Sequence, residues 1–128
     1  RASGLEISYV PQRADHLAGS LLEFAERQGI DRTQFLTILR KMDFSRALFE
    51  RDMAEYSAGQ QKKVLLAMSL CQHAHLYVWD EPLNYIDLFS RIQIEDLILE
   101  YQPTLLFVEH DLAFQRRTAT QVLQLDRA

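Results

Sequence analysis

Apolar and polar residues recur with two different periods along the chain, and these periods predict strands and helices in separate segments. Alternation at every second position indicates short strands, whereas apolar residues three and four positions apart indicate helices. Proline, glycine or a capping residue ends most of these segments. The predicted elements are strand 5–10, helices 17–27, 32–42, 58–73 and 88–101, strands 76–79 and 104–108, helix 111–117 and strand 120–125.

The order of these elements predicts an α/β fold with a parallel sheet. One strand is followed by two helices and an irregular connector at 45–53, and the rest alternates between strand and helix as βαβ units do. Strand 104–108 is almost wholly apolar, so we expect helices to cover both of its faces. The positions predicted to face the core are Phe35, Ile38, Leu39 and Met42 in one helix, Val64, Leu65, Met68 and Cys71 in the next, and Ile92, Ile94, Leu97, Ile98 and Leu99 in the last.

Composition narrows the class of protein. The chain has 128 residues, of which 48% are hydrophobic and 25% charged, as in one soluble globular domain or a part of one. Its net charge of −4 gives it no overall basic field for nucleic acid or an anionic membrane. The single Cys71 is predicted to be a buried structural thiol in a reducing, cytoplasmic setting. No apolar run has the length of a membrane span. Because the first residue is Arg1 rather than Met, we expect the chain to be part of a longer protein.

Two adjacent carboxylates follow the apolar strand 76–79, and they are the first candidates for chemistry. Asp80 and Glu81 come at the carboxyl end of the strand, the edge where open α/β sheets bind ligands. One acid there can hold Mg²⁺ together with phosphate oxygens, and a second can orient or deprotonate a water molecule. Pro82 then fixes the turn. The ordinary alternative is a pair of solvated acids at the end of a strand.

The start of helix 58–73 is the second candidate. Ser57 and Gln60 have the spacing of a capping box, in which each side chain bonds the backbone of the other residue. Bare backbone N–H groups at Ser57, Ala58 and Gly59 would also form a phosphate site at the positive end of the helix dipole. Gly59 would let a ligand approach closely. The simpler alternative is a well-capped helix without a ligand.

Gln12 and His110 follow two other predicted strands and complete a set of polar groups at one edge. Gln12 comes directly after strand 5–10, and a neutral amide can reach both a metal ion and an attacking water. His110 comes after strand 104–108, where it could contact a terminal phosphate or a developing charge. Each residue alone has an ordinary interpretation as a surface side chain. Four such elements in this order point more strongly to a site.

Together these segments resemble the nucleotide-binding domain of the ATP-binding cassette (ABC) superfamily. SYVPQ resembles the Q-loop, YSAGQQKK the signature motif with alanine for the more usual glycine, LYVWDEP the Walker B strand, LNYID the D-loop and FVEHD the switch-histidine loop. The resemblance implies a P-loop NTPase core with a parallel sheet and an inserted α-helical subdomain. It divides the chain into 1–12 (strand and Q-loop), 13–56 (helical subdomain) and 57–128 (signature helix to the last strand).

The resemblance also implies a role for each candidate residue, with ATP and Mg²⁺ as cofactors. Gln12 would sense the γ-phosphate, the metal and the water, and Asp80 would support Mg²⁺. Glu81 would be the general base, and His110 would contact the γ-phosphate. The residues that would serve ATP held by a second cassette, or lie at the interface with it, are Ser57, Ala58, Gly59, Gln60, Asn84 and Asp87.

Within the superfamily the chain looks most like the ABC-F group, proteins with two cassettes and no membrane span, some of which protect ribosomes from antibiotics. The asparagine in DEPLNYID and the segments SAGQQKKVLLAMSL and FVEHD carry this likeness. It implies a ribosome and its exit-site tRNA as partners. The alternative partner is a transmembrane subunit, served by a transporter ATPase. A third interpretation is a non-catalytic interaction module that retains the fold.

One expected motif does not occur among these 128 residues. The phosphate-binding loop G-x-x-x-x-G-K-[ST] is missing, because none of Gly4, Gly19, Gly29 and Gly59 precedes a lysine. We expect that loop, and the aromatic residue that stacks on adenine, to lie upstream of Arg1. We therefore expect the isolated chain to bind Mg-ATP weakly or not at all.

Overall fold

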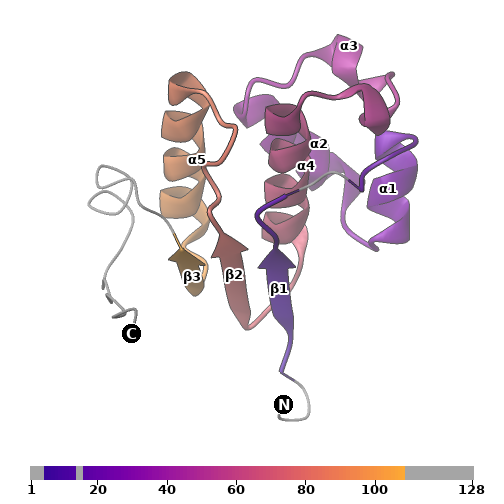
Figure 1. Ribbon diagram of the computed structural model, residues 1–128. Helices are drawn as coiled ribbons and strands as arrows, with labels where there is room; N and C mark the ends of the chain where they lie inside the picture. The colour runs from indigo at the N-terminus through magenta and orange to yellow at the C-terminus, as the bar shows by residue number, and fades with distance from the viewer. Residues whose placement is uncertain (1–4, 14–15, 109–128) are drawn as a thin grey trace.

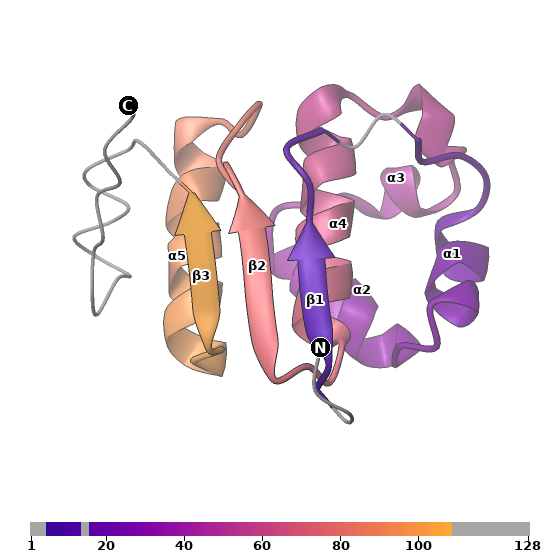
Figure 2. The same cartoon turned by 60° about the horizontal axis from the view of Figure 1, so that its bottom comes forward.

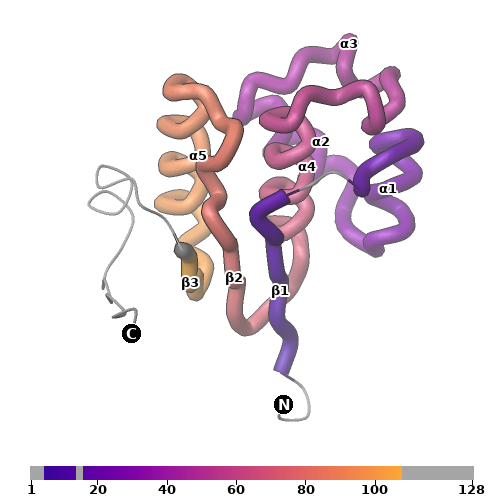
Figure 3. Tube along the Cα trace, viewed as in Figure 1, coloured from indigo at the N-terminus to yellow at the C-terminus, as the bar shows by residue number. Residues whose placement is uncertain are grey.

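The computed structural model describes residues 5–13 and 16–108 (Figures 1 and 3). The predicted helix 111–117 and strand 120–125 lie outside the described residues, as do Glu109 and His110. The elements in chain order are β1 (Ile7–Val10), α1 (Leu21–Arg27), α2 (Arg32–Lys41), α3 (Arg46–Phe49), the 3-10 helix η1 (Met53–Glu55), α4 (Ala58–Cys71), β2 (Leu76–Asp80), α5 (Leu88–Tyr101) and β3 (Leu105–Val108).

The three strands form one parallel sheet in the order β1-β2-β3, which confirms the predicted α/β fold. Val10 pairs with Trp79, and Trp79 in turn pairs with Phe107. All three strands point the same way in Figure 1, so the loops after β1 and β2 leave the sheet at one edge. Parallel pairing explains why residues distant in sequence meet there.

The helices lie on one side of this sheet. Helices α4 and α5 cover the face that is turned away from the viewer in Figure 2, and α1, α2 and α3 pack beyond α4. The opposite face carries Tyr9, which is 53% exposed, and Leu106, which is 59% exposed. Within the described residues, helices cover only one face of this sheet. The helix and strand predicted after β3 lie outside the described residues, so the covering of its second face stays a prediction.

Helix α4 is the centre of the core. It packs against β1 on one side and α2 on the other, so every residue from Lys62 to Cys71 is buried. The four core positions predicted for this helix are confirmed, but the burial is not confined to one stripe. Cys71 is buried as predicted, and this burial raises the pKa of its thiol to about 12.

Several element boundaries differ from the prediction for local reasons. Helix α1 begins at Leu21 rather than Leu17, because Gly19 has a left-handed φ of +86° and the Ser20 hydroxyl then caps the helix. The predicted connector 45–53 contains α3 and the start of η1. The predicted N-cap Asp31 is confirmed by a 2.9 Å bond from the Gln34 N–H.

The core positions predicted for α2 are confirmed, whereas those for α5 are confirmed only in part. Three of the four positions lie in α2 and the fourth, Met42, is its C-cap; all four are fully buried. In α5, Ile94, Leu97 and Ile98 are buried, but Ile92 and Leu99 are 46% and 45% exposed. Only one face of α5 lies against the sheet and its neighbours, so two of five apolar positions remain at the surface.

A chain of buried hydroxyl groups joins α4 to both strands it covers. The Trp79 Nε1–H on β2 donates to Ser69 Oγ on α4 at 2.9 Å. Ser69 Oγ and Ser8 Oγ on β1 lie 2.6 Å apart, and Ser8 also donates to Gln72 Oε1. Buried polar groups that are fully bonded specify one arrangement of a core. This network therefore fixes how α4 sits on the β1–β2 pair.

Candidate functional site

The carboxyl ends of β1 and β2 bring two of the predicted catalytic residues into contact. Gln12 Nε2 donates a hydrogen bond to Glu81 Oε2 at 2.6 Å, across 69 positions of sequence. Asn84 Nδ2 lies 3.3 Å from the same oxygen. Glu81 has a left-handed φ of +46°, an uncommon conformation for a residue with a side chain. The backbone turn directly after β2 thus presents this carboxylate to the Q-loop segment.

Asp80 is the last residue of β2, is half-buried, and pairs with Val108 of β3. Among residues 5–13 and 16–108, no group of three or more His, Cys, Asp or Glu side chains has the geometry of a metal site. One or two carboxylates suit a Mg²⁺ ion that brings its own phosphate oxygens and water, rather than an ion held by protein alone. The donor set at this edge therefore fits a nucleotide-bound Mg²⁺.

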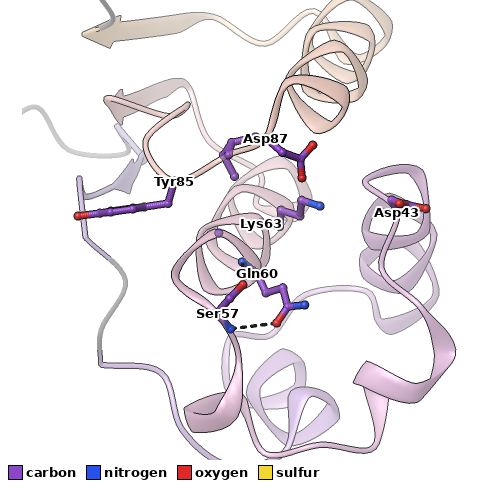
Figure 4. A pocket seen from close by; sticks show the side chains of 8 residues that line it. Asp43, Ser57, Gln60, Lys63, Tyr85 and Asp87 are labelled. Atoms are coloured by element: carbon purple, nitrogen blue, oxygen red, sulfur yellow. Dashed lines mark hydrogen bonds between the residues drawn. The ribbon is translucent and has the colours of Figure 1, made fainter.

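The capping box at the start of α4 is present as predicted. The Gln60 N–H donates to Ser57 Oγ at 3.1 Å, and the Ser57 N–H donates to Gln60 Oε1 at 2.9 Å, the bond drawn in Figure 4. The serine hydroxyl accepts in this bond, so its own proton can still be donated to an anion. The structural role of the two side chains is thus compatible with a role in phosphate binding.

Gly59 has a structural reason to lack a side chain. A Cβ at this position would overlap the backbone oxygen of Tyr85, well inside van der Waals contact. The close approach that the sequence suggested for a ligand is therefore made by this chain's own D-loop segment. Tyr85 itself has a φ of +68°, so the loop is sharply turned where it crosses the helix.

A cavity of about 290 Å³ opens beside these two segments (Figure 4). Lys63 lies between Asp87 and Asp43 in it, and its ammonium donates to the backbone oxygen of Met42 at 2.8 Å. Burial lowers the pKa of Lys63, and the two aspartates oppose that shift. The residues lining the cavity are Asp43, Ser57, Gly59, Gln60, Lys63, Tyr85, Ile86 and Asp87.

Asp87, predicted at an interface between cassettes, also has a role inside this chain. Its Oδ1 accepts the Ser90 N–H at 2.7 Å and caps α5. This backbone bond is the main reason that the pKa of Asp87 lies below its usual value, with Lys63 contributing less. The sequence signal for this cap is an aspartate three residues before a serine at the start of an apolar helix.

Lys62 is a residue of this site that sequence reasoning missed. Its side chain is fully buried, and its ammonium donates to the backbone oxygens of Pro11 and Gln12, both at 2.8 Å, and of Asp80 at 3.3 Å. The only sequence signal was a lysine pair within an otherwise apolar helix. Of the predicted site residues, Gln12, Glu81 and Asn84 are joined by hydrogen bonds at the sheet edge, and Asp80 directly precedes Glu81 there. Ser57, Gly59, Gln60 and Asp87 line the cavity, Ala58 is the first residue of α4, and His110 lies outside the described residues.

This combination of a parallel sheet, strand-end acids and a capped signature helix is that of an ABC ATP-binding domain. Residues 1–84 match the family model described as ABC transporter, and the chain belongs to that family. The ABC ATPase class of P-loop NTPase fold predicted from the motifs is thereby confirmed.

Two curated relatives illustrate the range of proteins to which the chain is similar. It is 32% identical over 127 residues to "Putative ATP-binding protein YdiF" of Bacillus subtilis (strain 168), an alignment that covers 96% of this chain and 20% of YdiF. It is 33% identical over 132 residues to the zinc import ATP-binding protein ZnuC of Vibrio cholerae, covering 98% of this chain and 50% of ZnuC. The chain thus spans between a fifth and a half of these two relatives.

Solved structures show the same fold. One chain of ribosome-bound archaeal Pelota and ABCE1 superposes with a TM-score of 0.75 at 25% identity, covering 89% of this chain and 20% of that one. The dimeric ABC transporter cassette MJ0796 superposes with a TM-score of 0.71 at 21% identity, covering 89% of this chain and 56% of that one. Within the described segments, no helix is both long and apolar enough to cross a membrane.

Proposed function

We propose that the chain is the catalytic part of an ATP-hydrolysing cassette in which Glu81 polarises the water that attacks the γ-phosphate. The contact between Gln12 Nε2 and Glu81 Oε2, at 2.6 Å, is the observation that carries this proposal. A carboxylate that already accepts two amide donors at a strand end is held in a defined orientation. Asp80 would support Mg²⁺, Gln12 would contact both metal and water, and His110 would contact the γ-phosphate.

The start of α4 would serve a second composite site. Ser57, Ala58, Gly59 and Gln60 present a helix N-terminus beside a cavity, and such a terminus favours phosphate oxygens. In this proposal the phosphate belongs to ATP held by a second cassette, with Asn84 and Asp87 at the interface. A pair of cassettes then forms two sites, each with an acid pair from one partner and a signature turn from the other. The phosphate-binding loop for each ATP would come from upstream sequence.

The partner we propose is the ribosome, through a two-cassette protein of the ABC-F type. The D-loop asparagine and the signature segment support this assignment by resemblance. The 20% coverage of YdiF means that this relative is about five times as long as the aligned segment, which leaves room for two cassettes. The transporter alternative is supported by ZnuC, of which the chain covers 50%. In that case the partner would be a transmembrane subunit.

Replacing Glu81 tests the catalytic assignment. In the intact protein that carries this chain, Glu81→Gln should lower steady-state ATP hydrolysis by about 10²-fold or more, since general bases contribute about 10²–10⁴-fold. ATP binding should persist, and the ATP-bound closed state should accumulate. Glu100→Gln is the matched control, because that carboxylate lies at the surface and pairs with Lys41. Turnover that survives Glu81→Gln would contradict the assignment.

Sedimentation of the same Glu81→Gln protein with Mg-ATP separates the two partners. Co-sedimentation with ribosomes in an ATP-dependent manner would support the ABC-F assignment. Recovery in the membrane fraction together with a transmembrane subunit would instead favour the transporter ATPase. If the intact protein neither binds nor hydrolyses ATP, the non-catalytic interaction module is the better description.

A further inference from the structure

Lys62 occupies an unusual position for a lysine, at the point where the β1–β2 ladder ends. The last paired residues are Val10 and Trp79. Residue 11 is a proline, which has no N–H to continue the ladder. Beyond this pair, the Lys62 ammonium links the two strands. It donates hydrogen bonds to the backbone oxygen of Asp80, which follows Trp79, and to those of Pro11 and Gln12, which follow Val10. A side chain from α4 thus joins the two strands where their backbones no longer pair.

The three acceptors define what this ammonium controls. An ammonium has three protons, and the carbonyl oxygens of Pro11, Gln12 and Asp80 lie at 2.8, 2.8 and 3.3 Å from Lys62 Nζ. Gln12 carries the amide that contacts Glu81, and Asp80 directly precedes Glu81 in the chain. Both partners of the 2.6 Å contact are therefore fixed through the backbone by one buried cation. Movement of either segment would break a charge-assisted hydrogen bond inside the core.

We propose that Lys62 is a positioning residue for the Gln12–Glu81 pair, setting the separation of the amide and the carboxylate at the sheet edge. The inference rests on the proposed function, in which that pair acts on the attacking water. All three of these hydrogen bonds go from Lys62 to backbone oxygens, and none goes to the side chain of Gln12 or Glu81. It acts by holding the two backbones, so its loss would loosen the pair without removing either group.

Steady-state kinetics of the intact protein distinguish positioning from binding. Lys62→Met preserves a long apolar stem and removes all three donors. We expect kcat to fall at least tenfold while the KM for Mg-ATP stays within twofold. Misalignment of Gln12 and Glu81 slows the attack of water on the γ-phosphate and does not change the affinity for the nucleotide. If Lys62→Met does not fold, Lys62→Gln, which retains a shorter polar group, is measured in the same way.

Two control variants separate positioning from general loss of stability. Ile38→Val trims a fully buried side chain in α2, far from the sheet edge in sequence, and should lower the thermal midpoint with kcat unchanged. Lys41→Met removes a surface lysine that pairs with Glu100. The proposal is overturned if Lys62→Met keeps kcat within twofold of wild type, if it raises KM alone, or if Ile38→Val loses as much kcat as Lys62→Met does.

A measurement without nucleotide keeps this inference independent of the proposed function. In NMR spectra of the intact protein that carries this chain, recorded without nucleotide, the side-chain amide signal of Gln12 can be assigned with Gln12→Asn. In Lys62→Met that signal should move towards the position of a glutamine amide that is bonded only to water, because the Glu81 acceptor is lost, whereas in Lys41→Met it should stay. An unmoved signal in Lys62→Met overturns the positioning role. If wild-type protein fails to hydrolyse ATP but the signal depends on Lys62, only the proposed function fails.

Discussion

The buried hydroxyl of Ser69 offers a quantitative test of how α4 is held on the sheet. Ser69→Ala removes the acceptor of the Trp79 indole N–H, which lies in a side chain with no exposed surface. Ser8 is less affected, because it keeps its bond to Gln72 Oε1. The variant therefore leaves one buried donor without this partner, while the rest of the network persists.

The expected cost follows from that single orphaned donor. A buried polar group that loses its partner costs about 1–3 kcal/mol. A loss of about 2 kcal/mol lowers the ratio of folded to unfolded protein roughly 30-fold. With a urea m value of about 1–3 kcal/mol/M, the midpoint of unfolding should fall by about 1 M. The cost of the small cavity left by the oxygen is contained in the same range.

Urea unfolding followed by the fluorescence of Trp79, the one tryptophan of the chain, measures this change directly. Ser8→Ala is the matched control, because it deletes the same atom from the same network but leaves the Trp79–Ser69 bond in place. The Ser69 hydroxyl, which loses Ser8 as its acceptor, can turn to a carbonyl of the preceding helical turn, whereas the indole N–H in Ser69→Ala cannot turn to a new acceptor. It should cost clearly less than Ser69→Ala. Equal costs for the two variants, or a loss for Ser69→Ala that falls below the range of about 1–3 kcal/mol, would refute the reasoning.

Two further predictions concern the loop between β2 and α5. Gly59→Ala should lower the thermal midpoint and displace the D-loop, because the added Cβ would overlap the backbone oxygen of Tyr85. The control Ala58→Gly adds no atom and should leave the D-loop in place. Crystal structures of the two variants check this. Asp87→Ala should cost about 1 kcal/mol in urea unfolding, and Asp87→Asn much less, because asparagine also caps helices. The pKa of Asp87 in the folded protein lies below its ordinary value of 3.8, so the ionised carboxylate stabilises the fold at pH values above 3.8. The difference in free energy of unfolding between wild type and Asp87→Asn should therefore disappear as the pH falls through the folded pKa.

The parts of the fold that depend on local pattern were predictable from sequence. The Asp31 cap, the capping box at Ser57 and the strand before Asp80 each lie within a few residues of the signal that predicts them. The meeting of Gln12 and Glu81 was also predictable, because parallel strands bring their carboxyl ends to one edge. In each case the prediction needed only one segment or the rule that orders parallel strands.

What was missed depends on contacts between distant segments. Lys62 follows a signature motif and is polar, so pattern alone places it at the start of a helix rather than in the core. Its burial results from carbonyl groups 50 and 51 positions earlier in the chain.

Helix α4 links the two ends of the candidate site, and its rigidity has a consequence for how they act. Gln60, at the first turn, faces the cavity beside the proposed phosphate site, and Lys62, two residues on, is bonded to the sheet edge. A hydrogen bond of 2.8 Å tolerates only a few tenths of an ångström before it weakens. Any displacement of the helix start by a partner's phosphate would therefore strain the Lys62 bonds unless the loops carrying Gln12 and Asp80 moved with it. On this reasoning, the signature turn and the acid pair respond as one unit, although each serves a different nucleotide in the proposed cassette pair.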